Sequence, residues 1–305
     1  MNKYIKLILD PRYRFSVFSS RGFYKKLSDE QFLRKKYKVK MRKEINLENP
    51  ETFTEKLQWL KLYDRKPIYT QMVDKHGAKQ YVADRIGEEH IIPTLGVWKS
   101  FDDIDFDSLP NQFVLKCTHD SGGLVICRDK SKLDKNAARA KINRSMKRNY
   151  YYLSREWPYK NVEPQIIAEK FMSDEINGSS LMDYKFYCFN GEPKFLYISS
   201  GLEDHSTAHI SFVTLDWEFA PFHRKDFAPF DVLPEKPTKF DDMLAYCREL
   251  SSGHSFLRVD LYQINGEVYF SELTFSPCGG FMPLKETEYD KILGDMLTLP
   301  IVDGK

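Results

Sequence analysis

Residues 256–281 read FLRVDLYQINGEVYFSELTFSPCGGF, and this stretch decides the fold that we expect for the chain. Asn265-Gly266 lies between two apolar runs that alternate as strands do, which is the pattern of a β-hairpin. Side chains alternate between the two faces of a strand, so Arg258 and Asp260 share one face of the first strand. By the same rule, Glu272 and Thr274 share one face of the second strand.

The length of the turn decides whether the acids of this hairpin meet. A two-residue Asn-Gly turn would pair Asp260 with Ser271 and put Glu272 on the opposite face. A three-residue turn, residues 265–267 with glycine in the left-handed conformation, would set Asp260 directly across from Glu272. Two facing carboxylates repel unless a cation joins them, and Mg²⁺ prefers one or two carboxylates plus phosphate oxygens. The alternative is a solvated hairpin face of alternating charge.

A second informative stretch is NQFVLKCTHDSGGLVICR at residues 111–128. Two β-type runs, 113–117 and 124–128, enclose a loop of small polar residues and glycines. Glycines allow backbone N–H groups to turn towards a phosphate, and Lys116 projects from the strand that leads into this loop. The spacing matches neither a P-loop nor G-x-G-x-x-G. The alternative is a simple hairpin turn. The loop residues of interest are Thr118, Ser121, Gly122 and Gly123.

Two further segments carry charged residues on predicted strands. IIAEKFM at 166–172 is a short apolar strand with Glu169, and DYKFYCFNG at 183–191 is a second hairpin signal. Asp183 and Lys185 share a face of that strand, either as ligand contacts or as a weak cross-strand ion pair. Helices are predicted over 27–43, after Thr52 or Thr54, over 130–148 and over 240–251.

The composition is that of a globular enzyme: 305 residues, 42% hydrophobic and 14% aromatic. The five cysteines are scattered and odd in number, which favours reduced thiols over disulfides or a zinc site. We find no apolar run of membrane-spanning length and no secretory signal. The expected location is therefore the cytoplasm, or a peripheral position at the inner face of the membrane.

The N-terminus is strongly basic, with fourteen Lys/Arg against four Asp/Glu in residues 1–44, and aromatic residues lie among them. This basic arm could dock onto an anionic membrane surface, an acidic polysaccharide or nucleic acid, or simply pack on the body as a solvated helical segment. We find no nucleic-acid-binding motif, so no nucleic acid partner is expected.

Three weaker patterns complete the survey. Arg155, in an aromatic loop, is a candidate contact for an acidic acceptor. The D-x-D pattern at residues 103–107 occurs in glycosyltransferases but also recurs by chance in acidic stretches. Four residues raise the question of a metal site, but their spacing favours ordinary surface or core histidines: Asp204, His205, His209 and His223.

Several ordered motifs together resemble the TupA-like ATP-grasp group, bacterial proteins linked to teichuronopeptide and capsular polysaccharide assembly. The resemblance runs from about residue 49 to about residue 283. The family usually reads R-x-D…E-x-N-x-x-P-G at the metal end, and Thr274 stands where the family has asparagine. The motifs are NPETFTEKLQWLKLYDR, NQFVLKCTHDSGG, REWPYKN, IIAEKF, DYKFYCFNG and RVD…SELTFSPCGG.

The resemblance implies an α+β ATP-grasp fold, with two lobes holding ATP between them and a helical basic arm in front. The implied division is a basic arm at 1–48, a pre-ATP-grasp region at 49–110, a small lobe with the phosphate-covering loop at 111–165, and a large lobe with the metal site at 166–305.

The resemblance also implies a reaction, the ADP-forming ligation of a carboxylate to an amine through an acyl phosphate. The carboxylate would belong to a uronic acid or other carboxylate-bearing glycan, and the amine to an amino acid or similar compound. Mg²⁺, with Mn²⁺ as a substitute, would lie on Asp260, Glu272 and Thr274. The implied catalytic residues are Lys116, Lys185 and Arg258, and the implied ATP contacts are Lys116, Thr118, Ser121, Gly122, Gly123, Glu169, Lys170, Phe171, Asp183 and Lys185.

Three other functions remain open at this point. A sugar or glycan kinase could use the same ATP site, and a required amine would separate it from a ligase. A glycosyltransferase would need a nucleotide-sugar site. A non-catalytic partner in a glycan assembly complex would use the basic arm and would not need Lys116, Asp260 or Glu272.

Overall fold

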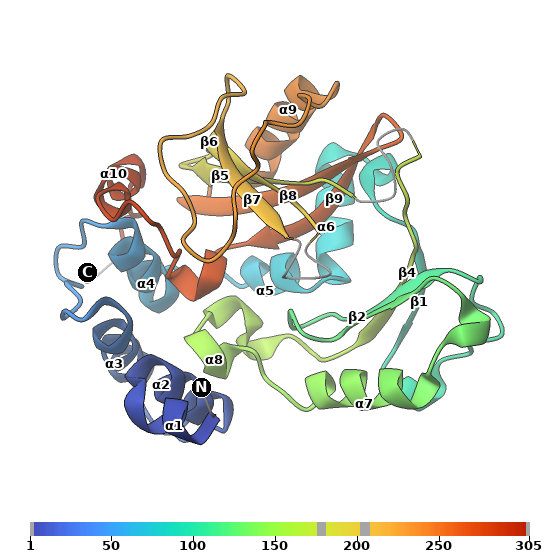
Figure 1. Ribbon diagram of the computed structural model, residues 1–305, viewed down its shortest axis with the longest axis horizontal. Coiled ribbons are helices and arrows are strands. Elements are labelled where there is room, and N and C mark those ends of the chain that lie inside the picture. The colour runs from blue at the N-terminus through green and yellow to red at the C-terminus, as the bar shows by residue number, and fades with distance from the viewer. Residues whose placement is uncertain (1–2, 176–180, 202–207, 303–305) are drawn as a thin grey trace.

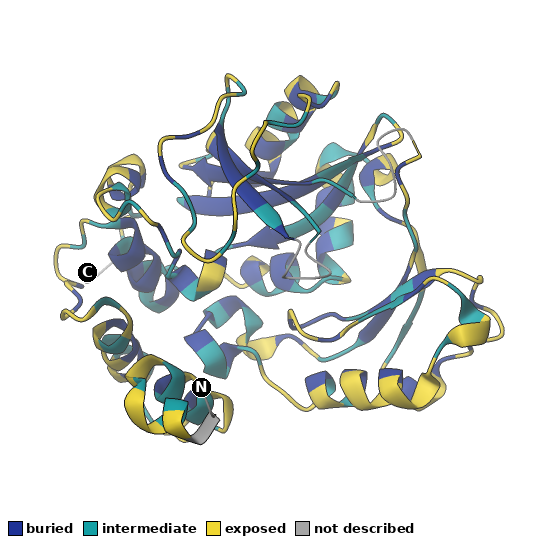
Figure 2. Ribbon diagram, viewed as in Figure 1, coloured by how far each residue is buried: buried dark blue, intermediate teal, exposed yellow. Residues whose placement is uncertain are grey.

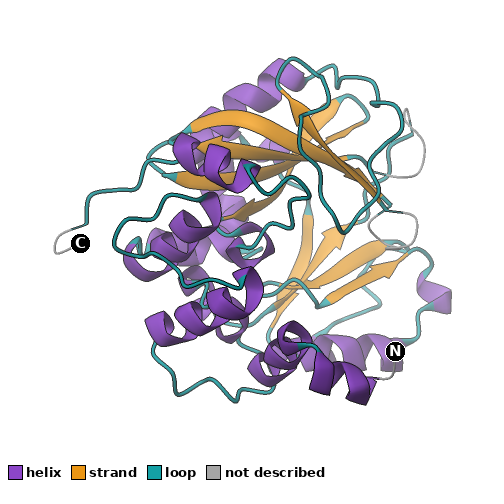
Figure 3. Cartoon of the chain, turned by 60° about the vertical axis from the view of Figure 1, so that its left-hand side comes forward, coloured by secondary structure: helices purple, strands orange, loops and turns teal. Residues whose placement is uncertain are grey.

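A computed structural model of the chain describes residues 3–175, 181–201 and 208–302 (Figure 1). Two antiparallel sheets form its centre, one of five strands and one of four. Figure 3 shows them as separate layers, with helices on their outer sides. This is the α+β architecture with two lobes that the sequence predicts.

The five-stranded sheet has the order β7-β6-β5-β8-β9. The predicted hairpins are confirmed in it: β5 and β6 join at Asn190-Gly191, and β8 and β9 join at Asn265-Gly266, with both residues of each turn at positive φ. The strands are β5 (Asp183–Phe189), β6 (Glu192–Ser200), β7 (His209–Thr214), β8 (Phe256–Ile264) and β9 (Glu267–Thr274).

The two faces of this sheet are covered differently. One face packs against α6 (Gly77–Ile86) and α9 (Phe240–Ser251) in the largest apolar cluster of the described chain. Part of the other face packs aromatic side chains against α4 (Phe53–Tyr63) and α10 (Tyr289–Met296). The remainder of that second face carries the charged residues of the predicted site. Figure 2 shows the sheet interior as the most buried part of the chain.

The four-stranded sheet has the order β1-β4-β2-β3, and α7 (Lys135–Met146) packs on it. Both predicted strands at 113–117 and near 124–128 are present. β4 pairs with β1 and β2, so this sheet includes residues on both sides of the expected domain boundary at residue 166. Its strands are β1 (Thr94–Trp98), β2 (Phe113–Cys117), β3 (Leu124–Cys127) and β4 (Ile166–Lys170).

The basic arm is helical, as predicted. It contains α1 (Lys3–Leu9), α2 (Pro11–Ser20) and α3 (Asp29–Met41). Capping boxes begin α3 at Ser28 and α4 at Thr52. In each, the hydroxyl accepts the backbone N–H of the third helical residue, and the side chain of that residue, Gln31 or Glu55, accepts the backbone N–H of the capping residue. The other helical segments are α5 (Ile68–Val73), α8 (Tyr151–Ser154), η1 (Glu88–His90), η2 (Phe101–Asp103), η3 (Lys130–Lys132), η4 (Trp157–Asn161) and η5 (Pro277–Gly280).

Arg155 fastens the arm to the body. Its side chain is 1% exposed, ion-pairs with Asp29 at 3.3 Å and donates to the carbonyl of Tyr24 at 2.8 Å. Arg65 also pairs with Asp29, at 2.6 Å. The interpretation of Arg155 as a contact for an acidic acceptor is therefore wrong, because its guanidinium is buried in the joint between arm and body.

No helix in the part of the chain that the structure describes is both long enough and apolar enough to cross a bilayer.

Gly294 tests the packing of α10 on α4. A Cβ built there would lie 2.1 Å from the Glu51 carbonyl oxygen and 2.8 Å from the Phe53 nitrogen. In a free helix, Gly→Ala stabilises by about 1 kcal/mol. Here we expect Gly294→Ala to lower the free energy of unfolding by about 1–3 kcal/mol, because backbone must move to admit the methyl group. Urea denaturation measures this.

The control is Asp295→Ala, the next residue of α10, on its exposed side. The Asp295 side chain is 61% exposed and its ion pair is with Lys291, so we expect a change within about 0.5 kcal/mol. A stabilised Gly294→Ala would contradict the close packing of the two helices.

Candidate active site

A β-bulge in the β8–β9 hairpin brings the two predicted metal-binding acids together. The turn has two residues, since Ile264 pairs with Glu267. The register nevertheless shifts between Asp260 and Leu261, which leaves Ser271 as the extra residue and sets Asp260 opposite Glu272. The structure thus combines the shorter of the two predicted turns with the register predicted for the longer one. Both carboxylates lie on the second face of the sheet.

Arg258 joins these acids. Its Nε and Nη2 lie 2.6 Å from the two oxygens of Asp260, and Nη2 also lies 3.0 Å from Glu272 and 3.0 Å from the Thr274 hydroxyl. Thr274 in turn donates to Glu272 at 2.8 Å. Burial would raise the pKa of Glu272, but the positive charges of Arg258, Lys75 and Lys185 hold that pKa at about 2.

Lys185 extends the network to a third acid. Its Nζ lies 2.7 Å from Asp260 and also pairs with Asp183. Burial, opposed by the charge of Lys185 and aided by that of Asp260, raises the pKa of Asp183 to about 6. Asp183, Asp260 and Glu272 carry three negative charges, and Lys185 and Arg258 carry two positive ones. The cluster is therefore one positive charge short of neutrality when all five groups are ionised.

This deficit and the hard oxygen donors fit a divalent cation, which takes carboxylate, hydroxyl and phosphate oxygens. Asp260 and Glu272, with Thr274 beside them, are the residues that would hold it. In the present arrangement cationic side chains occupy these oxygens. No group of three or more His, Cys, Asp or Glu residues arranged to hold a metal occurs within residues 3–175, 181–201 and 208–302.

A second charged cluster lies between the sheets. Glu169 of β4 accepts an ion pair from Lys116 of β2 at 2.5 Å and another from Lys79 of α6 at 2.6 Å. Burial would raise the pKa of Glu169, but the two ammonium groups hold it at about 2. Lys79 was not predicted as a site residue; it is the third residue of α6, four positions after Lys75. At the end of β4, Lys170 is exposed and Phe171 is half-buried under the Arg128 guanidinium.

The β2–β3 loop is closed on itself in this structure. Asp120 accepts the N–H groups of Gly122 at 3.2 Å and Gly123 at 3.0 Å. Ser121 contacts the Tyr150 hydroxyl at 3.4 Å. A Cβ at Gly123 would lie 2.3 Å from the Cys117 sulfur, so packing alone requires glycine there.

Thr118 is also enclosed, and its hydroxyl has no hydrogen-bond partner. The roles of these loop residues towards a phosphate remain predictions, since the two glycine N–H groups are engaged by Asp120.

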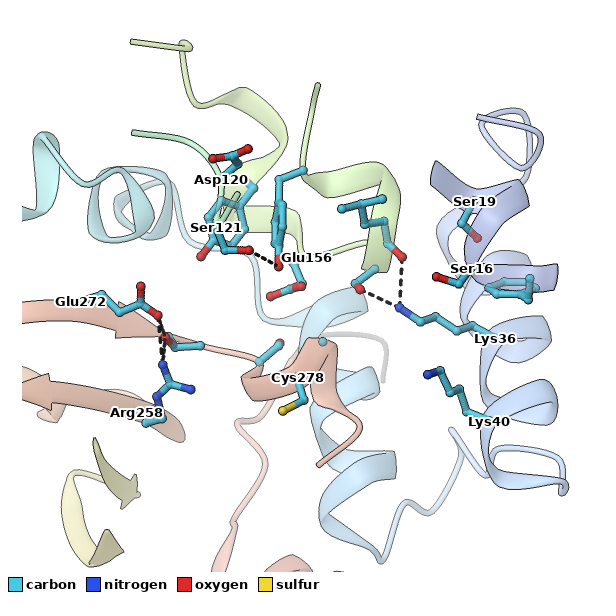
Figure 4. Close-up of a pocket in the computed structure, with 18 of the residues that line it drawn as sticks. Ser16, Ser19, Lys36, Lys40, Asp120, Ser121, Glu156, Arg258, Glu272 and Cys278 are labelled. Atoms are coloured by element: carbon cyan, nitrogen blue, oxygen red, sulfur yellow. Dashed lines mark hydrogen bonds and ion pairs between the residues drawn. The ribbon is translucent and has the colours of Figure 1, made fainter. Parts of the chain in front are cut away.

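A cavity of about 350 Å³ lies next to the hairpin acids (Figure 4). Arg258, Glu272 and Thr274 line one side of it, and the β2–β3 loop contributes Asp120 and Ser121. Helices of the basic arm line the opposite side. The predicted site and the arm therefore enclose one space, which the sequence did not indicate.

Glu156 is a further acid of this cavity that sequence reasoning missed. Its side chain is 5% exposed and, among the residues described, has no hydrogen bond or ion pair within bonding distance. Burial raises its pKa, and the nearby charges of Lys61 and Lys36 oppose that rise. The only sequence signal was its place in the motif REWPYKN.

The remaining sequence patterns do not gather at this site. His223 pairs with Glu286 at 3.3 Å, and His209 stacks near Phe230. Asp204 and His205 lie outside the residues that the structure describes. In the D-x-D stretch, Ile104 and Phe106 are buried in the small-lobe core while Asp103, Asp105 and Asp107 are exposed. The alternation of aspartates with apolar residues is therefore explained by a segment that has one buried side and one side in solvent.

Comparison with known proteins gives one clear family relation. The sequence model of the family described as TupA-like ATPgrasp matches residues 55–298, which is most of the chain. The basic arm precedes the matched region. No curated protein sequence matches the chain.

Similar solved structures include D-alanine–D-alanine ligase from Bacillus anthracis complexed with ATP, with 15% identity and a TM-score of 0.38, covering 80% of this chain and 65% of that one. D-alanyl-alanine synthetase A from Vibrio cholerae has 13% identity and a TM-score of 0.40, covering 75% and 59%. ATP-grasp ligase PsnB, complexed with a variant precursor, Mg and ADP, has 11% identity and a TM-score of 0.42, covering 92% and 75%. The chain thus spans less than two thirds of the first two.

Glu169 generates a prediction about stability and pH. Its folded pKa of about 2 lies below its unfolded value of 4.5, so its contribution is present above pH 4.5 and is lost as the pH falls towards 2. We expect Glu169→Gln to lower the free energy of unfolding at pH 7 by about 1–3 kcal/mol, since two cations lose their acid. The difference from wild type should shrink below pH 4.5 in urea titrations.

Glu163→Gln is the matched control. Glu163 pairs with Lys99 at 2.8 Å, but both side chains are about two-thirds exposed or more. We expect a loss within about 0.5 kcal/mol at any pH. A Glu169 effect that is equally small, or independent of pH, would contradict a buried ionised Glu169.

Proposed function

The chain belongs to the TupA-like ATP-grasp family, and from this premise we propose that it is an ATP-dependent carboxylate–amine ligase. The observation that carries the proposal is the bulged hairpin, which gathers Asp260, Glu272 and Arg258 on one face beside Lys185. The proposed carboxylate belongs to a uronic acid or similar residue of a bacterial surface polysaccharide. The proposed amine belongs to an amino acid or related compound.

The proposed reaction has two steps. A carboxylate oxygen attacks the γ-phosphorus of ATP, the bond from that phosphorus to the bridging oxygen breaks, and ADP leaves with its electron pair. The amine nitrogen then attacks the acyl phosphate carbon, the carbon–oxygen bond to phosphate breaks, and phosphate leaves as the amide forms. A bound Mg²⁺ would supply charge neutralisation at the phosphates.

The residues of the chain have distinct proposed roles. Lys116, Lys185 and Arg258 offset the charge that builds on the transferred phosphoryl group, a role that depends on positioning and electrostatics. Asp260, Glu272 and Thr274 would hold the metal, Mg²⁺ or Mn²⁺ in its place. The proposed nucleotide contacts are Thr118, Ser121, Gly122, Gly123, Glu169, Lys170, Phe171 and Asp183, together with Lys116 and Lys185.

A glycosyltransferase is the weaker alternative. Its only sequence support was the D-x-D stretch, where Asp105 accepts the backbone N–H of Asp107 at 3.0 Å on the outer side of the small lobe. These acids flank buried Ile104 and Phe106, so packing already accounts for the alternation. A sugar kinase shares every proposed ATP contact and is therefore distinguished by its products.

The test offers ATP and Mg²⁺ to the full chain with uronic acids and amino acids, singly and in pairs, and follows ADP and joined products by mass spectrometry. We expect ADP only when both partners are present, with a product lighter than their sum by one water. Asp260→Asn and Glu272→Gln should each lower this rate at least about 100-fold, because each removes the carboxylate charge that would hold the metal on the phosphates. Asp105→Asn is the control and should keep the rate.

Other results would change the assignment. ADP with a sugar alone and a stable phosphorylated sugar would identify a kinase. If the Glu272→Gln variant keeps the full rate, Glu272 does not hold a metal that the reaction needs.

We also propose that the basic arm holds the protein at an anionic membrane surface. The support is the exposure of large apolar side chains on α1: Ile8 is 70% exposed and Leu9 is 69% exposed, and Ile5 is 49% exposed. The same arm carries an excess of ten positive charges within residues 1–44. Apolar insertion together with basic residues is the combination that binds anionic lipid surfaces.

Vesicle co-sedimentation tests this second proposal. We expect the wild-type protein to bind vesicles that contain phosphatidylcholine and phosphatidylglycerol. It should bind vesicles of phosphatidylcholine alone much less, and high salt should weaken its binding to the mixed vesicles. Ile8→Glu combined with Leu9→Glu should weaken binding at least about tenfold. Ile301→Glu is the control, since Ile301 is 99% exposed but lies outside the arm. Equal binding of the double variant and wild type would contradict the proposal.

A further inference from the structure

The basic arm supplies one wall of the cavity beside the hairpin acids. From α2 come Phe15, Ser16 and Ser19, and from α3 come Lys36 and Lys40. Figure 4 shows the side chains of Lys36 and Lys40 extending from the arm towards Cys278 and the cavity, with Glu156 between them and the Arg258–Glu272 side. All of these arm residues precede residue 55, where the match to the family begins. This wall is therefore a property of this chain beyond the shared ATP-binding core.

The arm wall holds two lysines, and the charge of Glu156, across the cavity, acts on Lys36. Lys40 is an exposed residue whose ammonium group makes no hydrogen bond or ion pair with any described residue, although it lines the cavity. Lys36 donates to the Ser154 hydroxyl at 2.6 Å and to the Leu153 carbonyl at 3.0 Å, so one of its three donors is left over. Burial lowers the pKa of Lys36 well below its usual value, and the charge of Lys61 lowers it further. The charge of Glu156 opposes this, and the charge of Lys40 adds a smaller lowering. An anion at this place would accept the remaining donor of Lys36 and pair with the ammonium group of Lys40.

A buried hydroxyl points to the same conclusion. Ser19 is 6% exposed, lines the cavity, and its Oγ has no hydrogen-bond partner. Leaving a buried polar group unpaired is unfavourable, and a hydrogen bond to a ligand oxygen would remove that cost. Ser16 lines the cavity one turn earlier on the same helix. The anion is therefore one that accepts hydrogen bonds from hydroxyls as well as ammonium groups, as a carboxylate does.

The acid of the cavity that has no partner is Glu156. Asp120 is satisfied by two backbone N–H groups and the Ser145 hydroxyl, and Glu272 by Arg258 and Thr274. Glu156 has none of these bonds and is nearly fully buried. It is therefore free to accept hydrogen bonds from a ligand ammonium group. A ligand that carries both a carboxylate and an ammonium group would complement the two ends.

We propose that this cavity binds the amine substrate as an amino acid, with its own carboxylate on Lys40, Lys36 and Ser19 and its amine at Glu156. The assignment rests on the proposed ligase function for the fate of the amine. The ammonium group gives one proton to Glu156, and its nitrogen lone pair then forms the amide bond as phosphate leaves with its bonding electrons. The second proton leaves with phosphate. The arm thereby selects amines that carry a carboxylate.

Binding without turnover tests the proposal. Calorimetry uses the full chain at pH 7.5, with glycine, L-alanine, L-glutamate and L-lysine as probes, each compared with its carboxamide. We expect at least one amino acid to bind at least tenfold more tightly than its carboxamide. Lys40→Ala should remove that preference, and Lys40→Arg should keep most of it. Lys38→Ala, on the same helix but paired with Glu44 at 2.5 Å and outside the cavity, should leave the preference intact.

Titration of ADP with Mg²⁺ into the same proteins separates this proposal from the ligase proposal. If the wild-type protein does not bind ADP but does prefer the amino acid over its carboxamide, the ligase proposal is wrong and the amino-acid site is supported. If the wild-type protein binds ADP but none of the four amino acids, the proposed amino-acid site is wrong. The site is also wrong if an amino acid and its carboxamide bind equally well, or if the Lys40→Ala variant keeps the preference for the amino acid.

Glu156→Gln provides a second variant at the other end of the cavity. We expect it to weaken binding of the amino acid at least about tenfold while ADP binding is unchanged. In the assay that follows ADP formation with both substrates present, it should also remove the acidic limb of the pH–rate profile, because no carboxylate remains to accept the proton. A purely structural Glu156 would instead change ADP binding and amino-acid binding together and leave the shape of the pH profile unchanged.

Discussion

The neutralisation of Asp260 is the constraint on which this site depends. Its side chain is fully buried at the centre of the five-stranded sheet and accepts three bonds of 2.6–2.7 Å from Arg258 and Lys185. An ionised group in such a place is tolerated only with close partners, because removal of one partner leaves a buried charge uncompensated. β5 must therefore lie beside β8 to supply Lys185, and the bulge then adds Glu272 to the same cluster.

Local sequence patterns predicted most of the framework. The Asn-Gly turns, the alternating strands and the helix caps each depend on neighbours within a few residues, and these elements are where the patterns indicated. The register of the hairpin was the exception. A two-residue turn and facing acids looked mutually exclusive, but one extra residue at Ser271 allows both. Nothing in the local sequence marks Ser271 as the extra residue, because serine is an ordinary strand residue and the register is set by how the two whole strands pair.

The residues missed by sequence reasoning act over long separations. Lys79 reaches Glu169, Lys36 reaches Ser154, and Asp29 joins Arg155. From the composition alone, the lysines of the arm were expected to be exposed and to give it a positive surface. The composition could not indicate that Lys36 is buried and faces a cavity, because that depends on the docking of α3 against α8. Arg155 was misjudged for the same reason: its charge is used in that docking.

The charge balance also limits how the proposed metal end can be loaded. Glu272 and Asp260 can release Arg258 only if another positive charge takes its place, since Arg258 bonds both of them. Arg258 can turn away only towards another anion, because its own guanidinium is buried. A cation arriving alone would stand beside two uncompensated cationic side chains, and a phosphate arriving alone would meet three carboxylates. Under the proposed function, Arg258 and Lys185 therefore exchange carboxylates for phosphate oxygens in one event, when nucleotide and metal enter together.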